Sequence, residues 1–225
     1  MSDFSQILRT FKTHGSRKNV LGMSRFGIIS KKAYGLSAPV LHRLARKYRR
    51  NHELALQLWK TGIHDARILA ALIDDPRQVT KRQMEQWVRQ FDNWAVCDTT
   101  VGKLFSRVPG AFETAVRWSS NRKEFIKRAG YAMMAYLTIR QKEAENTKFI
   151  RLFPHLQRGS VDGRNYVKKS VNWAIRQIGK KNANLNRAAI RFAKKLHSMN
   201  VPSARWIASD ALRELTSSAV QKRLR

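Results

Sequence analysis

One stretch of this chain decides its fold: Ala66-Arg67-Ile68-Leu69-Ala70-Ala71-Leu72-Ile73. Its large apolar side chains recur at intervals of three and four residues, which is the spacing of a buried stripe on an α-helix. Leu54, Leu58 and Trp59 show the same spacing earlier in the chain. Alternating β-patterns of useful length are absent, and the sequence therefore predicts an all-α protein.

Helices of this kind recur along the chain. In four of them a basic residue leads into small and apolar residues, and in the fifth the marker position is an acid. The markers are Arg67, Asp98, Arg128, Lys169 and Arg205, with spacings of 31, 30, 41 and 36 residues. Such periods are typical of helical-repeat solenoids such as HEAT-like arrays, in which equivalent helices line one face. We therefore expect a concave basic groove.

Turn-forming residues divide the chain into short helical pieces that we expect to form antiparallel pairs. The breaks are Gly35 with Ser37-Ala38-Pro39, Thr61-Gly62, Asp74-Asp75-Pro76, Pro109-Gly110, Gly159-Ser160 and Pro202-Ser203. We predict a single α-helical repeat domain over residues 1–225, with helix pairs over residues 35–225. Residues 1–34 are expected to form an irregular or short-helix N-terminal cap, because Gly15, Gly22 and Gly27 interrupt them.

The chain carries a large excess of positive charge. It has 45 Lys+Arg against 15 Asp+Glu, a formal net charge of +30. The basic residues lie inside or beside periodic apolar segments, so the charge belongs to the folded body. DNA, RNA and anionic membrane surfaces are the natural partners of such a body. The alternative is that the charge is only solvated surface.

The composition also excludes several classes of protein. No apolar stretch approaches the roughly 20 residues of a membrane helix, and no hydrophobic core of a signal peptide is present. Cys97 is the one cysteine, so no internal disulfide can form, and we expect a cytoplasmic protein, associated with the nucleoid in a bacterium. No histidine near Cys97 in sequence activates it as a nucleophile, so packing is its expected role. We expect no metal, no cofactor and no membrane partner.

One expected helix combines a tryptophan with cations. Lys169, Trp173, Arg176 and Lys180 have offsets of 0, 4, 7 and 11 residues, which places them on one helix face. An indole flanked by cations suits phosphates together with a base or sugar. The alternative is a core tryptophan with a rim of solvated cations.

A second pair of residues also shares a helix face. Trp94 and Asp98 are four residues apart, and Asp98 is an acid in a chain that has few. Asp98 could instead cap the segment that follows it or pair with a cation, and Trp94 could be part of the core. Trp206 and Asp210 have the same spacing, but an ion pair with a neighbouring arginine accounts for Asp210.

At these residues the chain resembles the DNA alkylation repair glycosylase family with HEAT-like repeats. The matching segments are residues 34–39 (Y-G-V-x-x-P in the family), 58–70 (W…E-x-R-x-x-A), 91–98 (W-D-x-x-D), 126–129 (R-R-A) and 167–176 (K-A-x-x-W-x-L-R). They occur in the family's order. Two positions depart from the pattern: Ala95 stands where the family usually has an acid, and Asp65 replaces a usual glutamate.

The resemblance implies an activity and the residues that perform it. The family excises N3- and N7-alkylated purines from duplex DNA without flipping the base into a pocket, unlike most glycosylases. Its acid matches Asp98, and its two sugar-facing tryptophans match Trp94 and Trp173. The arginine that grips the backbone beside the lesion matches Arg128.

This chemistry needs few groups. A purine alkylated at N3 or N7 is already a cation, so its departure requires no protonation by an acid. Positive charge then develops on the deoxyribose, and one carboxylate can stabilise it and position water. Indole faces add attraction for the cationic sugar and lesion.

We therefore predict a monofunctional DNA glycosylase of base excision repair, a hydrolase that acts as a monomer on duplex DNA containing alkylated purines. Asp98, Trp94 and Trp173 are the expected catalytic residues. The expected DNA-binding residues are Arg128, Lys169, Arg176, Lys180 and Arg67. The alternatives are a non-catalytic helical-repeat protein that binds bent, damaged or branched DNA, and an RNA- or ribosome-associated scaffold.

Overall fold

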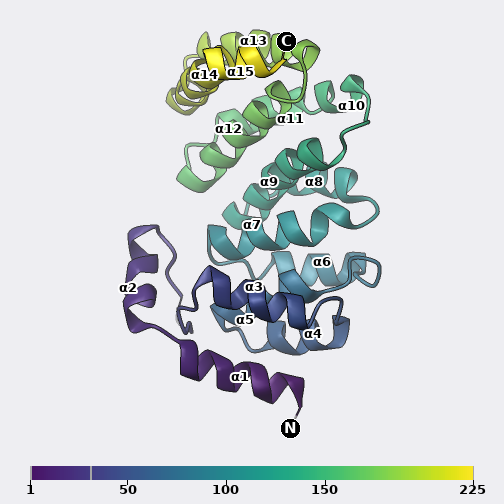
Figure 1. Cartoon of the computed structure of the whole chain (residues 1–225). Helices are drawn as coiled ribbons and strands as arrows, with labels where there is room; N and C mark the ends of the chain where they lie inside the picture. Colours follow the sequence, from purple (N-terminus) through teal and green to yellow (C-terminus); the bar gives the residue numbers. More distant parts are fainter. Residues whose placement is uncertain (1, 31, 225) are drawn as a thin grey trace. The chain divides into compact units, whose positions relative to one another are not determined.

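The computed structural model describes residues 2–30 and 32–224, and all regular secondary structure in these residues is helical. The prediction of an all-α protein is therefore confirmed. The chain divides into two compact units, Met1–Pro109 and Gly110–Arg225, here called the N-terminal unit and the C-terminal unit (Figure 1). One domain over residues 1–225 stays a prediction.

The N-terminal unit is built around one apolar helix. Its elements are α1 (Asp3–His14), α2 (Arg17–Arg25), α3 (Ala38–Lys47), α4 (His52–Lys60), α5 (His64–Ile73), α6 (Lys81–Val88), α7 (Trp94–Lys103) and the 3-10 turn η1 (Phe105–Arg107). The helix α5 is buried on most of its surface and packs against α3, α4 and α7. Trp59 of α4 stacks on Trp87 of α6 with ring centroids 3.8 Å apart. A helix that is apolar nearly all round belongs in a core, which is where α5 lies.

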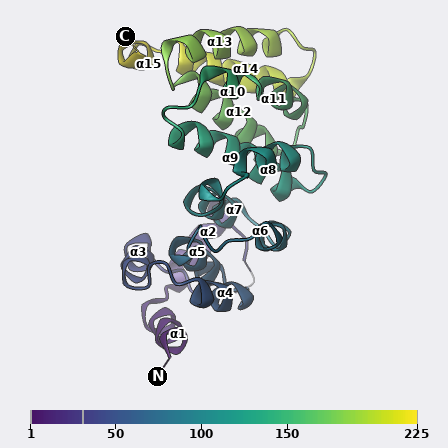
Figure 2. The same ribbon diagram turned by 90° about the vertical axis from the view of Figure 1, so that its right-hand side faces the viewer.

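The C-terminal unit has two long helices in its interior. Its elements are α8 (Ala111–Ser119), α9 (Glu124–Arg140), α10 (Asn146–Ile150), α11 (Phe153–Ser160), α12 (Asn165–Gly179), α13 (Ala183–His197), α14 (Pro202–Leu215) and α15 (Ser218–Leu224). The helix α9 packs against α8 and α12, and α12 also packs against α13 and α14 (Figure 2). The last pair, α13 and α14, is closely packed as well.

The predicted helix repeat is visible in this packing. The five markers lie in the second helix of each successive pair: Arg67 in α5, Asp98 in α7, Arg128 in α9, Lys169 in α12 and Arg205 in α14. Within the N-terminal unit α5 packs against α7, and within the C-terminal unit α9 packs against α12 and α12 against α14. Helices that occupy equivalent positions in the sequence repeat therefore form a layer in each unit.

The segment expected to form an N-terminal cap contains two helices, α1 and α2. Gly15 separates the two helices and Gly27 follows the second. Gly22 lies inside α2 and does not interrupt it, because a single glycine costs a helix only about 1 kcal/mol.

Close backbone contact between α8 and α9 depends on Gly130. A Cβ atom at this position would lie 2.4 Å from the backbone nitrogen of Ser119 and 2.7 Å from the carbonyl oxygen of Ala115. Both atoms belong to the backbone of α8, so neither can turn away as a flexible side chain would. The glycine therefore sets the distance between the two helices.

We expect Gly130→Ala to lower the free energy of unfolding by about 2 kcal/mol, because overpacking forces the two helices apart. Gly22→Ala is the matched control, since no atom lies within 4 Å of a Cβ there and alanine favours the helix. Urea unfolding of both variants measures the difference. A Gly130→Ala protein as stable as the control would show that the helices do not depend on this contact.

Asp162 secures the turn that leads into α12. Its carboxylate accepts hydrogen bonds from the guanidinium of Arg164 at 2.6 Å and from Nζ of Lys127 in α9 at 2.9 Å. These two cations hold the pKa of the Asp162 carboxyl well below its ordinary value, although partial burial opposes them. The charged carboxylate therefore joins the turn to α9.

Asp162→Asn should lower the free energy of unfolding by about 2 kcal/mol near neutral pH, because the charge-assisted hydrogen bonds are lost. A pKa that is lower in the folded chain stabilises the fold above the ordinary value of 3.8, and the contribution disappears as the pH falls through the lowered pKa. The difference from wild type should thus shrink in acid. Thermal unfolding at neutral pH and well below the ordinary pKa checks this, and an equal difference at both would contradict it.

Candidate nucleic-acid interface

The helix α7 presents the first candidate pair. Asn93 caps it, because its side-chain oxygen accepts a hydrogen bond from the backbone nitrogen of Val96 at 3.0 Å, and the helix therefore begins at Trp94. Asp98 lies in the middle of α7, so the interpretation of Asp98 as a cap of the following segment is wrong. Trp94 and Asp98 are both half-buried on the same helix.

The position of Trp94 is fixed by a contact that the sequence did not predict. Its indole Nε1 donates a hydrogen bond to the carbonyl oxygen of Phe26, the residue that ends α2, at 2.8 Å. With its indole only half-buried, Trp94 is not the enclosed core residue that one interpretation assumed. The hydrogen bond orients the ring and leaves part of it accessible.

A buried carboxylate holds the backbone just before α3. Asp65 of α5 is 2% exposed and accepts hydrogen bonds from the backbone nitrogens of Tyr34 at 2.7 Å and Leu36 at 2.8 Å. Gly35 contributes a longer one at 3.4 Å and has a positive φ of 71°, a conformation that favours glycine. A carboxylate that accepts several backbone N–H groups is strongly held, because hydrogen bonds to a charged group exceed ordinary ones.

Tyr34 and Gly35, which Asp65 holds, are in turn hydrogen-bonded to α2 and its cap. The carbonyl oxygen of Tyr34 accepts from the backbone nitrogen of Ser16 at 2.8 Å, and that of Gly35 accepts from the side chain of Asn19 at 2.9 Å. Ser16 caps α2 and Asn19 lies within it. A chain of hydrogen bonds therefore runs from Asp65 through α2 to Trp94. The sequence marked Asp65 only as a departure from a family motif, although an acid in the most apolar helix was a signal of a structural role.

Arg67 also belongs to the N-terminal unit, and its contacts are internal. Its guanidinium donates to the backbone and side-chain oxygens of Gln90, both at 3.2 Å, and lies over the ring of Trp59 at 5.4 Å. One nitrogen lies 3.6 Å from the carboxylate of Asp92. Only 13% of the side chain is exposed, so the structure places Arg67 against the turn before α7.

In the C-terminal unit, Trp173 of α12 is half-buried. It packs edge-to-face on Tyr136 of α9, with ring centroids 4.9 Å apart and planes at 82°. Lys169, one turn earlier on α12, is exposed. This contact of Tyr136 was not predicted, because nothing in the sequence aligns the two helices. Part of the indole is therefore accessible, with an exposed lysine one turn away, and contact with phosphate and sugar stays a prediction.

Arg128 of α9 makes a contact within the C-terminal unit. It is 7% exposed, and its guanidinium donates to the backbone oxygen of Tyr166 at 2.7 Å. This hydrogen bond ties α9 to the first turn of α12. The residue that the resemblance assigned to the DNA backbone thus has a structural contact in this unit.

Arg176 and Lys180, which follow Trp173 on the same face of α12, contact the same acid. Both contact the carboxylate of Glu214 in α14, and Arg176 also lies 3.7 Å from Asp210. Burial raises the pKa of Glu214, but the hydrogen bond from Lys180 and the charge of Arg176 outweigh it, and the pKa is lowered. Lys169 on this face is therefore exposed, whereas Arg176 and Lys180 join α12 to α14.

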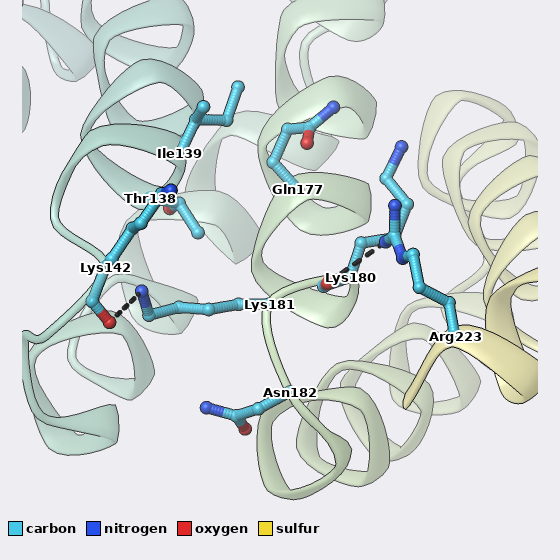
Figure 3. Close-up of a pocket in the computed structure, with 8 residues that line it drawn as sticks. All are labelled: Thr138, Ile139, Lys142, Gln177, Lys180, Lys181, Asn182 and Arg223. Atoms are coloured by element: carbon cyan, nitrogen blue, oxygen red, sulfur yellow. Dashed lines mark hydrogen bonds between the residues drawn. The ribbon is translucent and has the colours of Figure 1, made fainter. Parts of the chain in front are cut away.

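Beyond Lys180 the cations lie around an open hollow of about 590 Å³ (Figure 3). Nζ of Lys181 donates to the carbonyl oxygens of Gln141 and Lys142, at 2.7 and 2.9 Å. Arg223 donates to the carbonyl oxygen of Lys180 at 3.1 Å. These carbonyls directly follow α9 and α12, close to helix ends that leave acceptors unsatisfied. Much of the positive charge here stabilises helix ends.

The N-terminal unit contains a long segment without acids. Residues 4–52 contain 12 Lys+Arg and no Asp or Glu. Some of these cations surround a hollow of about 270 Å³ between α3, α5 and α7, lined by His42, Arg46, Arg49 and Lys103 among others. The whole-chain composition concealed this distribution, which a count of acids by segment would have found. A surface of one sign attracts polyanions.

The structure shows how the remaining candidates are placed. Cys97 is fully buried in α7, which agrees with a packing role. Within residues 2–30 and 32–224, no group of three or more His, Cys, Asp or Glu side chains could hold a metal ion. No helix in the same ranges is long and apolar enough to cross a membrane.

Comparisons with known proteins extend these observations. An uncharacterized protein of Listeria innocua, Lin0241, is 26% identical over 171 residues, which cover 75% of this chain and 74% of that protein. Lmo0209 of Listeria monocytogenes, also uncharacterized, matches to the same extent. A solved structure superposes with a TM-score of 0.80 at 17% identity, covering 99% of this chain and 96% of that one. It is described as "a new family of proteins related to the HEAT-like repeat DNA glycosylases with affinity for branched DNA structures".

The structural match confirms the predicted HEAT-like helical-repeat fold. The family model of the DNA alkylation repair enzyme matches residues 7–215, which is nearly the whole chain. The match includes α7 and α12, the helices that carry Trp94, Asp98 and Trp173. The chain therefore belongs to the DNA alkylation repair enzyme family.

Proposed function

We propose that the protein binds duplex DNA and hydrolyses the glycosidic bond of N3- and N7-alkylated purines. The observation that carries the proposal is the half-buried pair of Trp94 and Asp98 on one helix, with the indole oriented by its hydrogen bond to Phe26. The family membership and the net charge of +30 support the DNA as substrate.

Asp98 acts on the sugar in this proposal. The alkylated purine departs as a neutral base and takes the electron pair of the C1′–N bond with it, so positive charge develops at C1′. A carboxylate close to C1′ stabilises that charge through space and holds the attacking water. As the new C–O bond forms, the water gives its proton to this carboxylate, which passes it to solvent. No acid for the leaving group is required.

The two tryptophans bind rather than exchange protons. The exposed part of the Trp94 indole contacts the sugar beside Asp98. An indole face attracts a cation by about 0.5–2 kcal/mol, so this ring favours the charged transition state. In the C-terminal unit, the accessible part of the Trp173 indole binds a DNA sugar. Tyr136 holds Trp173 from the side, which limits its rotation.

Exposed cations contact the DNA phosphates in this proposal. Lys169 is exposed beside Trp173, and the acid-free residues 4–52 supply a further positive surface. Arg67, Arg128, Arg176 and Lys180 reach DNA only if they leave or share the contacts described above, so we assign them first to positioning α5, α9 and α12. The protein acts as a monomer in this proposal.

Asp98→Asn should lower the rate of base release from duplex DNA containing 7-methylguanine or 3-methyladenine about 10²–10³-fold, since the stabilising charge is lost. Binding of the same DNA should be unchanged or tighter, because a negative charge near the phosphates is removed. Single-turnover base release and fluorescence anisotropy measure the two quantities.

Asp210→Asn is the matched control, because Asp210 follows Trp206 at the same spacing but pairs with Arg213 and Arg176. It makes the same change of charge on α14 and should leave base release within about twofold of wild type. Base release by Asp98→Asn at the wild-type rate would refute the assignment of Asp98. It would favour the interpretation of that residue as an ion-pair partner.

A second function has a specific observation in its favour. The solved structure with a TM-score of 0.80 is described as having affinity for branched DNA, and Ala95 stands where the resembled glycosylases usually have an acid. The second candidate is therefore a helical-repeat protein that binds branched DNA without cutting it. Salt-sensitive DNA binding with no base release from either methylated purine would identify this function.

A further inference from the structure

The N-terminal cap leaves three large apolar side chains in solvent. Leu21, Phe26 and Ile29 are 64%, 70% and 77% exposed, the highest values among the large hydrophobic residues that the structure describes. All three lie within nine residues of sequence. Single exposed apolar residues are ordinary, but a cluster of them marks a surface that a partner covers.

The fold does not use this side of α2. None of the helix's residues is buried, and it is attached to the unit through Ser16, Asn19 and the close approach of Val20 to Gly35. The other side borders an open hollow of about 680 Å³, lined in part by Leu21 and Phe26. Leu21 and Phe26 are therefore not part of the core.

Cations surround the same hollow. Arg17, Lys18 and Arg25 line it together with the apolar side chains, and no acid occurs in residues 4–52. A surface that combines apolar and aromatic side chains with uncompensated cations complements nucleic acid, since bases offer flat apolar faces and the backbone offers phosphates.

The patch is continuous with the candidate interface on α7. The carbonyl oxygen of Phe26 accepts the hydrogen bond of the Trp94 indole at 2.8 Å, so the exposed phenyl ring and the exposed part of the indole belong to neighbouring residues in space. An anionic membrane surface would also suit an apolar and basic helix. The contact with Trp94 favours DNA, because the same ligand can then reach both rings.

We propose that Phe26, supported by Leu21 and Ile29, contacts the face of an unstacked base in DNA. The flanking cations Arg17, Lys18 and Arg25 hold the adjacent phosphates. The patch thereby favours DNA in which a base pair is open, as at a branch point, over continuous duplex. This inference rests on the proposed DNA binding at α7 and adds a residue that determines specificity.

The test compares a three-way DNA junction, with 2-aminopurine at the branch point, with a linear duplex of equal length. Phe26→Ala should lower the affinity for the junction about tenfold, the effect of losing one base–aromatic stack. Its affinity for the linear duplex should change less than about twofold. Phe26→Trp should restore junction binding, and 2-aminopurine fluorescence should respond to wild type and Phe26→Trp but not to Phe26→Ala.

Val161→Ala is the control, because Val161 is 50% exposed and lies in the C-terminal unit, so its variant should match wild type on both DNAs. Equal junction affinity of wild type and Phe26→Ala would overturn the inference, as would an equal loss on junction and duplex. Binding of phosphatidylserine vesicles that depends on Phe26, without an effect on DNA, would assign the patch to a membrane.

The same measurements separate this inference from the proposed function. Wild type that binds neither DNA would refute the proposed function together with this inference. Wild type that binds both, with Phe26→Ala unaffected, would refute the inference alone.

Discussion

The carboxylate of Asp65 is the contact on which the arrangement of the N-terminal unit depends. It lies in the central helix α5 and holds the backbone of residues 34–36, which in turn holds α2. Because α2 has no buried side chain of its own, these hydrogen bonds replace the apolar packing that normally places a helix. The carbonyl oxygen at its end orients Trp94. One buried charge therefore connects the core to the surface where we expect chemistry.

Scarcity of acids explains much of the remaining structure. Asp74 accepts from His52 at 2.6 Å and Gln83 at 2.7 Å, while Asp162 and Glu214 each join two cations on neighbouring elements. These three acids stabilise contacts within the fold. With 15 acids and 45 Lys+Arg, most cations have no acid available to them, and a polyanion is the partner that the surface as a whole can neutralise.

The sequence predicted the helices and their repeat, because periodic apolar residues and turn residues are local signals. It also placed Trp94, Asp98 and Trp173 on helix faces, where the structure finds them half-buried. The contacts of Asp65, Phe26 and Tyr136 were missed, because each joins segments that are far apart in the sequence. For Arg128 and Arg67 the sequence did not predict the contacts with backbone carbonyl oxygens, since a motif names a residue type but not its partners within the fold.

The central claim is that Asp65 positions Trp94 through α2, and the indole N–H of Trp94 reports on it directly. Its NMR signal, assigned with Trp94→Phe, should be protected from hydrogen exchange in wild type. In Asp65→Asn, an NH2 group that cannot accept a hydrogen bond replaces one of the two carboxylate oxygens. The Trp94 signal should therefore exchange faster, while the signals of Trp59 and Trp87 in the core stay protected. Base release should fall in the same variant. Unchanged protection of Trp94 in a folded Asp65→Asn protein would contradict the account.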